Sequence, residues 1–272
     1  MLIDRDFAEQ LGHETVGILK AGGYTARAGT RIDLSAELDR CRHATVEYPP
    51  DSPLSTQSQS RYRTAITVEN ATVLDVGRRL AEGGPVAALN FAAAGHPGGG
   101  FLAGARAQEE SIARSSGLFH AIDGRRMYAF HRKRADPMYS DWVIYSPDVP
   151  VFRTDDGCLL ERPWNLSILT CAAVNGVEME RHAPHRMRDV PAVMRQRTAR
   201  VLTVAVAHDV RHLILGAWGC GAFGLDTHMM AGIFHEALAG RFDGVFEDVV
   251  FAITDWSPER RFIGPFAERF GE

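Results

Sequence analysis

The chain has 272 residues, of which 45% are apolar and 24% charged, and its 30 Lys and Arg against 34 Asp and Glu give a net charge of −4. This apolar content suffices for a large hydrophobic core and excludes an intrinsically disordered chain. No apolar run reaches the roughly 18 residues of a membrane-spanning helix. The mildly negative charge argues against direct binding of nucleic acid, which usually relies on a basic surface.

Residues 1–60 are predicted to form an N-terminal accessory extension rather than a separately folded domain. Helical patterns cover residues 4–21 and 34–41. The stretch Tyr48-Pro49-Pro50-Asp51-Ser52-Pro53 cannot be helical, and the polar residues that follow up to Ser60 are typical of a linker or an extended arm. The main domain is therefore predicted to occupy residues 61–272.

In this main domain, helical and strand patterns alternate, with breaks that contain glycine or proline. In chain order, the pattern predicts a helix at 71–81 with Asn70 as its N-cap, a strand at 86–92, a helix at 105–120, a strand at 142–145, a hairpin at 151–160, a strand at 166–173, a helix at 190–208, a strand at 212–218, a helix from Asp226 or Thr227 to Gly240, and a strand at 245–253. Such alternation predicts an α/β fold, a three-layer sandwich with helices on both faces of a largely buried sheet.

The cysteines and the first residues bear on the compartment. Cys41, Cys158, Cys171 and Cys220 include no close pair, which fits a reducing environment. The start Met1-Leu2-Ile3-Asp4-Arg5-Asp6 has acidic residues where a secretory signal needs a basic and then an apolar region. We therefore expect a cytoplasmic protein.

The most informative segment is the loop that follows the strand at 86–92. It contains Gly98-Gly99-Gly100, and Gln108-Glu109-Glu110 lies on the helix that comes next. Successive glycines let backbone N–H groups approach an anionic oxygen such as that of a phosphate. A carboxyl group beside phosphate charge and partly shielded from water has a raised pKa, which suits a general acid for a glycosidic oxygen. Taken alone, however, a triple glycine is more often a flexible turn than a site, and Gln-Glu-Glu on a helix is usually a solvated face.

The fuller pattern resembles the signature of poly(ADP-ribose) glycohydrolases, in particular the bacterial type. It runs from Asn90-Phe91-Ala92 through Pro97-Gly98-Gly99-Gly100-Phe101-Leu102 to Gln108-Glu109-Glu110-Ser111. The stretch Leu-Gly-Ala-Trp-Gly-Cys-Gly-Ala-Phe-Gly at 215–224 is similar to the second phosphate-binding loop of that family. The resemblance implies a macrodomain-like fold with a mixed central sheet, an N-terminal helical extension and a catalytic domain at 61–272.

The resemblance also implies an activity, the hydrolysis of ribose–ribose O-glycosidic bonds of poly(ADP-ribose) to release ADP-ribose. The implied catalytic residues are Glu110 and Glu109. Glu110 would protonate the departing ribose oxygen and then deprotonate a water, while Glu109 would hold ribose hydroxyls and tune Glu110. The other implied substrate-binding positions are Asn90, Gly98, Gly99, Gly100, Gln108, Gly219, Gly221, Ala222, Phe223 and Gly224. The glycine loops would bind the diphosphate through backbone N–H groups, and Phe223 would pack on a terminal ribose. Neither a metal nor a cofactor is expected.

Two residues depart from the family pattern. Ala93 stands where many macrodomains have an asparagine that contacts the distal ribose, and His96 stands where bacterial relatives often have asparagine. One polar ribose contact is therefore expected to be lost or supplied differently. Thr254-Asp255-Trp256, which follows the last strand, is a weaker candidate for contacting adenine or ribose.

Two other functions remain compatible with these loops. A non-catalytic reader would bind ADP-ribose through the same backbone groups, and a mono-ADP-ribosyl hydrolase would remove single units from protein or nucleic acid, because one fold supports several such reactions. The Gln108-Glu109-Glu110 motif favours the enzyme, since a reader does not need it. The expected partners are poly(ADP-ribose) or ADP-ribose and ADP-ribosylated proteins, without a membrane or direct nucleic-acid binding.

Overall fold

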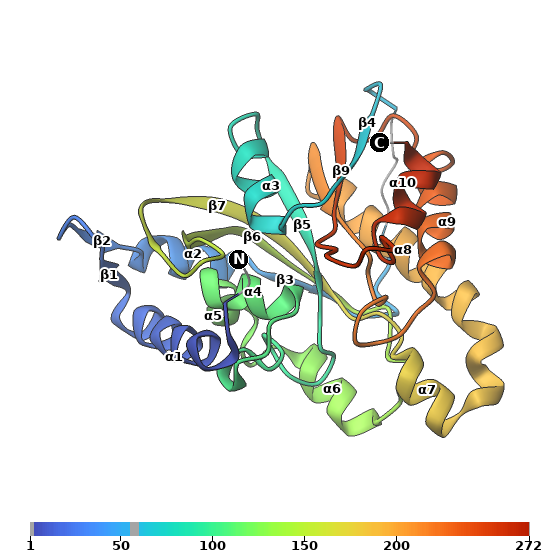
Figure 1. Cartoon of the computed structure of the whole chain (residues 1–272), viewed down its shortest axis with the longest axis horizontal. Coiled ribbons are helices and arrows are strands. Elements are labelled where there is room, and N and C mark those ends of the chain that lie inside the picture. Colours follow the sequence, from blue (N-terminus) through green and yellow to red (C-terminus); the bar gives the residue numbers. More distant parts are fainter. Residues whose placement is uncertain (1–2, 55–59, 272) are drawn as a thin grey trace.

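A seven-stranded mixed sheet forms the centre of the computed structural model, which describes residues 3–54 and 60–271 (Figure 1). In spatial order its strands are β3 (Val46–Tyr48), β6 (Val143–Arg153), β7 (Leu159–Cys171), β5 (Val86–Phe91), β8 (His212–Leu215), β9 (Asp248–Ala252) and β4 (Ala65–Glu69). The strands from β7 to β4 are parallel, whereas β6 and β3 continue the sheet in antiparallel pairs. The carboxyl ends of the parallel strands therefore meet at one edge.

Helices cover both faces of the sheet (Figure 1). One face carries α2 (Ser35–Ala44), α3 (Val73–Leu80), α4 (Gln108–Ser115), α5 (Leu118–Ile122) and α6 (Arg126–Arg134), and the other carries α7 (Gly176–His182), α8 (Val190–Ala207), α9 (Thr227–Leu238) and α10 (Gly264–Phe270). Each face has its own hydrophobic core. In β5, Val86 and Ala88 point into the core under the first group of helices, and Ala87 and Leu89 point into the core under the second group. The predicted three-layer sandwich is thus confirmed. No helix among the described residues is long and apolar enough to cross a membrane.

The N-terminal part packs directly on the sheet and on the loop before α4. It consists of α1 (Arg5–Ala21), the hairpin β1 (Gly23–Thr25) and β2 (Arg31–Asp33), α2, and β3, which pairs with β6 of the main sheet. A Cβ on Gly12 of α1 would lie 2.5 Å from the Phe101 carbonyl oxygen, so the two backbones touch. The boundary at residue 60 stays a prediction, and residues 55–59 of the predicted linker lie outside the described residues.

Most predicted elements exist, but two predictions were wrong. The helix predicted at 105–120 is divided into α4 and α5, because Ser116 is extended and forms a β-bridge with Val151 of β6. The N-cap of α3 is Thr72, whose hydroxyl accepts from the Asp75 N–H at 3.1 Å. Asn70 instead binds the backbone of Asp255. The sequence pattern does not predict several further elements, most of them short: β1, β2, β3, β4, α6, α7 and α10.

Arg153 of β6 joins α1 to the end of α4. Its guanidinium is 1% exposed, donates to the carbonyl of Arg114 at 2.6 Å and pairs with Glu14 of α1 at 2.7 Å. We predict that Arg153→Ala lowers the free energy of unfolding by about 3 kcal/mol, because buried acceptors lose their donor. The exposed pair Arg195–Glu236 supplies the control: Arg195→Ala should cost less than about 1 kcal/mol. Equal losses in urea unfolding would contradict this role.

Candidate active site

A cavity of about 710 Å³ opens at the edge where the parallel strands end. Its walls come from the start of α3, the end of β5, the start of α4, the turn between β6 and β7, the loop after β8 and the segment after β9. Segments that lie far apart in the sequence therefore share one hollow. This is the ligand position typical of open α/β sheets.

Gln108 anchors the start of α4 to the end of β5. Its side-chain oxygen accepts from the Phe91 N–H at 2.9 Å, and its amide nitrogen donates to the Leu89 carbonyl at 2.7 Å. The amide thus continues the hydrogen bonding of the strand edge. As a result, the two glutamates that follow Gln108 have fixed positions relative to the sheet.

Both oxygens of Glu109 are already bound by the protein. Glu109 is 3% exposed, accepts from the Ala93 N–H at 2.6 Å, and accepts from the Asn90 amide at 3.3 Å. Burial raises the pKa of Glu109 to about 8, against the hydrogen bond from Ala93 and with a further increase from the charge of Glu110. At neutral pH this carboxyl therefore carries a proton for much of the time.

Glu110 has one oxygen left for a ligand. It is 8% exposed, lines the cavity and accepts from the Gly100 N–H at 2.9 Å through Oε1. Its Oε2 is buried and has no hydrogen-bond partner among the described residues. Because an unsatisfied buried carboxylate oxygen costs free energy, this atom points to a function.

The triple glycine wraps around the two carboxylates. Gly98 and Gly99 adopt the left-handed region, with φ of +72° and +60°. A Cβ on Gly99 would lie 2.1 Å from Oε1 of Glu110 and 3.0 Å from Oε2 of Glu109. Neither these glycines, nor Gly100, nor the fully buried Asn90 lines the cavity. Contact between these residues and a diphosphate stays a prediction. In this structure they lie against the carboxylates and support them.

The loop after β8 forms another part of the cavity wall. Four of the predicted residues line the cavity: Gly219, Gly221, Ala222 and Phe223. Gly224 does not, although its φ of +67° turns the loop. A Cβ on Gly219 would lie 2.8 Å from that of Ala173, whereas one on Gly221 would meet nothing within 4 Å. Gly219 is therefore required by packing, and Gly221 leaves its backbone open to a ligand.

Cys220, in the same loop, is not suited to nucleophilic catalysis. Burial raises the pKa of the Cys220 thiol to about 12, so it stays protonated and is a poor nucleophile. Within residues 3–54 and 60–271, no group of three or more His, Cys, Asp or Glu side chains could hold a metal ion.

Sequence reasoning missed part of the cavity wall. Thr72 at the start of α3 donates to Asp155 in the β6–β7 turn at 2.6 Å, and burial raises the pKa of Asp155. Arg106 and Phe262 also line the cavity. These residues belong to separate elements and form no sequence motif, so only the fold reveals that they are neighbours.

The segment after β9, a weaker candidate in the sequence, does line the cavity. Trp256 lies at the wall and is 72% exposed. The segment folds around Asp255, which accepts from the backbone N–H groups of Ser257, Phe262 and Ile263. Burial alone would raise the pKa of Asp255, but these hydrogen bonds lower it to about 2. Trp256 thus projects from a firmly held turn.

Comparison with known proteins places this site in a family. The model of the microbial-type PARG catalytic domain matches residues 12–154, just over half of the chain. The chain belongs to the microbial-type poly(ADP-ribose) glycohydrolases. Its fold is accordingly the macrodomain-like sandwich that the resemblance implied. No curated protein sequence matches the chain.

Solved structures agree with this membership. The poly(ADP-ribose) glycohydrolase from Thermomonospora curvata is 42% identical, with a TM-score of 0.92 over 98% of this chain and 100% of that one. Its complex with the inhibitor ADP-HPD has a TM-score of 0.91 at the same identity and coverage. The enzyme from Deinococcus radiodurans in complex with ADP-ribose is 37% identical, with a TM-score of 0.80 over 85% of this chain and 96% of that one.

The contact between Gly99 and the carboxylates yields a direct test. We predict that Gly99→Ala lowers kcat by at least about 100-fold, because the methyl group must displace the Glu110 carboxylate. Gly29→Ala is the matched control: its φ is +84°, but an added Cβ meets nothing within 4 Å. It should cost about 1 kcal/mol of stability and no activity. Steady-state kinetics showing equal activity in both variants would refute the contact.

The raised pKa of Glu109 predicts how stability depends on pH. The pKa of Glu109 in the folded state, about 8, exceeds its pKa in the unfolded state. The contribution of this carboxyl to stability is therefore complete at pH values below the unfolded-state pKa, and it is lost as the pH rises through 8. Wild type should therefore lose stability from pH 5 to pH 8. Glu109→Gln should lose clearly less, because it cannot ionise. Parallel curves from urea unfolding would show that Glu109 is not the group responsible.

Proposed function

We propose that the chain is a poly(ADP-ribose) glycohydrolase that cleaves ribose–ribose O-glycosidic bonds and releases ADP-ribose, with Glu110 as general acid and base. The observation that carries the proposal is the buried, unpartnered Oε2 of Glu110 in a cavity of ligand size. Support comes from the two bacterial relatives, whose structures hold the inhibitor ADP-HPD and ADP-ribose. A reader that only binds ADP-ribose has no need for this oxygen.

In the proposed reaction, the Glu110 carboxyl donates a proton from Oε2 to the glycosidic oxygen. The bond between that oxygen and the anomeric carbon breaks, and the departing ribose leaves as an alcohol. The remaining sugar becomes an oxocarbenium-like cation, which the nearby diphosphate stabilises. A water then attacks the anomeric carbon, and its proton returns to Glu110. One carboxyl thus performs both proton transfers, and Gly100 keeps it in place through Oε1.

The remaining residues would hold the ADP-ribose unit along the cavity. The open backbone around Gly221 suits a diphosphate, and Phe223 at the same wall suits the terminal ribose. Glu109 would contact ribose hydroxyls, which offsets the lost asparagine at Ala93. At the other wall, Trp256 and Phe262 offer aromatic surface on which an adenine ring can stack.

The N-terminal extension would act as a buttress of the catalytic domain. Its Ile3 lines the cavity and accepts from the Arg106 guanidinium at 2.9 Å, just before α4. We therefore propose that residues 1–60 form an accessory extension and that residues 61–272 form the catalytic domain.

The four cysteines of the described structure are free, which favours a reducing compartment, and we propose a cytoplasmic location. Poly(ADP-ribose) and ADP-ribosylated proteins are the proposed partners.

Incubation with purified poly(ADP-ribose), followed by chromatography of the products, tests the function directly. Free ADP-ribose is expected as a product. Intact polymer after incubation with enzyme that still binds ADP-ribose would indicate a reader. Release of ADP-ribose only from mono-ADP-ribosylated protein would instead indicate a mono-ADP-ribosyl hydrolase.

Glu110→Gln tests the assignment of the acid. The amide cannot donate and recover a proton as the acid does, so ADP-ribose release should fall by at least about 100-fold. The affinity for ADP-ribose, measured by calorimetry, should change little because the shape is preserved. Glu9→Gln removes an exposed carboxylate on α1 and should leave the rate unaltered. Near wild-type polymer degradation by Glu110→Gln would overturn the mechanism.

A further inference from the structure

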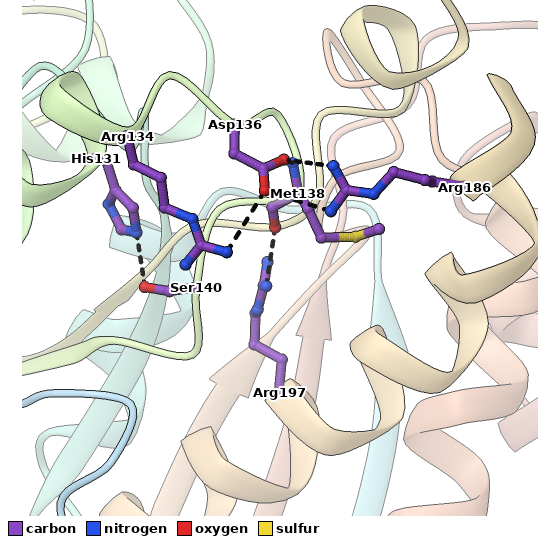
Figure 2. A network of polar contacts seen from close by, with 7 residues as sticks. All are labelled: His131, Arg134, Asp136, Met138, Ser140, Arg186 and Arg197. Carbon is purple, nitrogen blue, oxygen red and sulfur yellow. Dashed lines mark hydrogen bonds and ion pairs between the residues drawn. The ribbon is translucent and has the colours of Figure 1, made fainter. Parts of the chain in front are cut away.

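The loop between α6 and β6 is held by several buried and partly buried polar contacts (Figure 2). Arg186 forms a fork on Asp136, with N–O distances of 3.1 and 3.3 Å, and Arg134 approaches the same carboxylate at 3.5 Å. Burial disfavours ionisation of Asp136, but the Arg186 fork and the Met138 N–H hold its pKa below the ordinary value. This carboxylate therefore stays charged and keeps the loop attached to the chain before α8.

A second attachment comes from α8. Arg197 is 1% exposed and donates to the Met138 carbonyl at 3.0 Å and to the Ala172 carbonyl at 2.8 Å. Ala172 directly follows β7. One guanidinium thus connects the loop to the edge of the sheet at which the cavity opens.

A third attachment runs through a neutral histidine. Burial lowers the pKa of His131 to about 4, so the ring is uncharged and has a single N–H. Nδ1 lies 3.3 Å from the Ala94 carbonyl, which can only accept, and Nε2 lies 2.7 Å from the Ser140 hydroxyl. The ring therefore donates to Ala94 and accepts from Ser140. It bridges this loop and the loop after β5. We call these three attachments, through Asp136, Met138 and Ser140, the loop clamp.

The loop clamp encloses Tyr139, which adopts φ of +53°. This conformation is disfavoured for a bulky side chain and persists only where the surroundings impose it. The Tyr139 ring packs on the small cluster Ala92, Ala94 and Ala172, next to His131. Its other neighbour is Phe223, with ring centroids 6.1 Å apart and planes at 46°.

Phe223 is held on its backbone side as well. Its carbonyl accepts from the Val177 N–H at 3.1 Å, at the start of α7, and the Asn175 N–H just before α7 donates to Pro137 of the clamped loop at 2.9 Å. The loop with Tyr139, the start of α7 and the loop with Phe223 therefore form one connected unit. Phe223 lines the cavity, and Tyr139 does not.

We propose that Tyr139 is a positioning residue: fixed by the loop clamp, it supports the Phe223 ring in the position at which that ring packs on the terminal ribose. The inference rests on the proposed function, in which Phe223 packs on that ribose. Tyr139 touches no substrate, and its effect is transmitted through the ring of Phe223. An aromatic ring at position 139 is what matters, because the packing on Phe223 and on the alanine cluster involves the ring.

Tyr139→Ala tests the inference. Removal of the ring frees Phe223, so the dissociation constant of ADP-ribose and the KM for polymer should rise about tenfold. The pH dependence of kcat should stay unchanged, because the carboxylates are untouched. Tyr139→Phe should restore both constants to wild-type values. Tyr48→Ala is the matched control: Tyr48 packs on His208 at the edge strand β3, so its loss should lower stability without altering affinity per folded molecule.

A second variant covers the case in which Tyr139→Ala does not fold. Asp136→Asn keeps the shape of the loop but removes the charge that Arg186 grips, and it should raise the dissociation constant of ADP-ribose by a factor of about three. Wild-type affinity in Asp136→Asn and in folded Tyr139→Ala would overturn the proposal. That result would leave the proposed function intact. The proposed function itself fails only if the wild-type enzyme releases no ADP-ribose from polymer.

Discussion

The site depends on keeping two adjacent carboxyl groups out of water at the start of α4. Desolvation of a single carboxylate costs several kcal/mol, and a second one beside it adds repulsion. The protein offsets this cost locally. The first turn of a helix favours negative charge, the N–H groups of Ala93 and Gly100 each bind one glutamate, and protonation of Glu109 removes one of the two charges. The proposed chemistry uses what this arrangement leaves over, a single unpartnered oxygen of Glu110.

The glycine loop illustrates how far the sequence leads. The spacing of Gly98-Gly99-Gly100 and Gln108-Glu109-Glu110 predicts that backbone and carboxylates share a site, and they do. The sequence pattern does not show, however, which group the glycine backbone contacts. A free backbone suits a phosphate and a carboxylate equally well, and only the φ angles of Gly98 and Gly99 decide that the missing Cβ of Gly99 would face Glu110. Gly221 in the second loop keeps the open position that both loops were expected to have.

The same distinction applies to the fold. The strands β5, β8 and β9 are apolar on both faces, so composition alone reveals them. The division of the helix predicted at 105–120 depends on Ser116 pairing with Val151, a partner 35 positions along the chain. The strands β3 and β4 are short, lie at the sheet edges and are only partly buried, so their pattern is weak. Trp256 could be suspected because it follows a predicted strand, whereas Thr72 and Asp155 meet only through tertiary structure.

Two parts of the cavity wall differ in how far the protein covers them, and this difference suits the proposed catalysis. The loop that supports Phe223 is bound by buried polar contacts, as the His131 and Arg197 attachments show (Figure 2). In the segment after β9, by contrast, Trp256 is 72% exposed. An adenine held there contributes binding free energy at a distance from the reacting bond. In the proposed mechanism, that free energy presses the sugar linkage against Glu110, which the Gly100 N–H holds in place, and it thereby raises the rate of the chemical step rather than only the affinity.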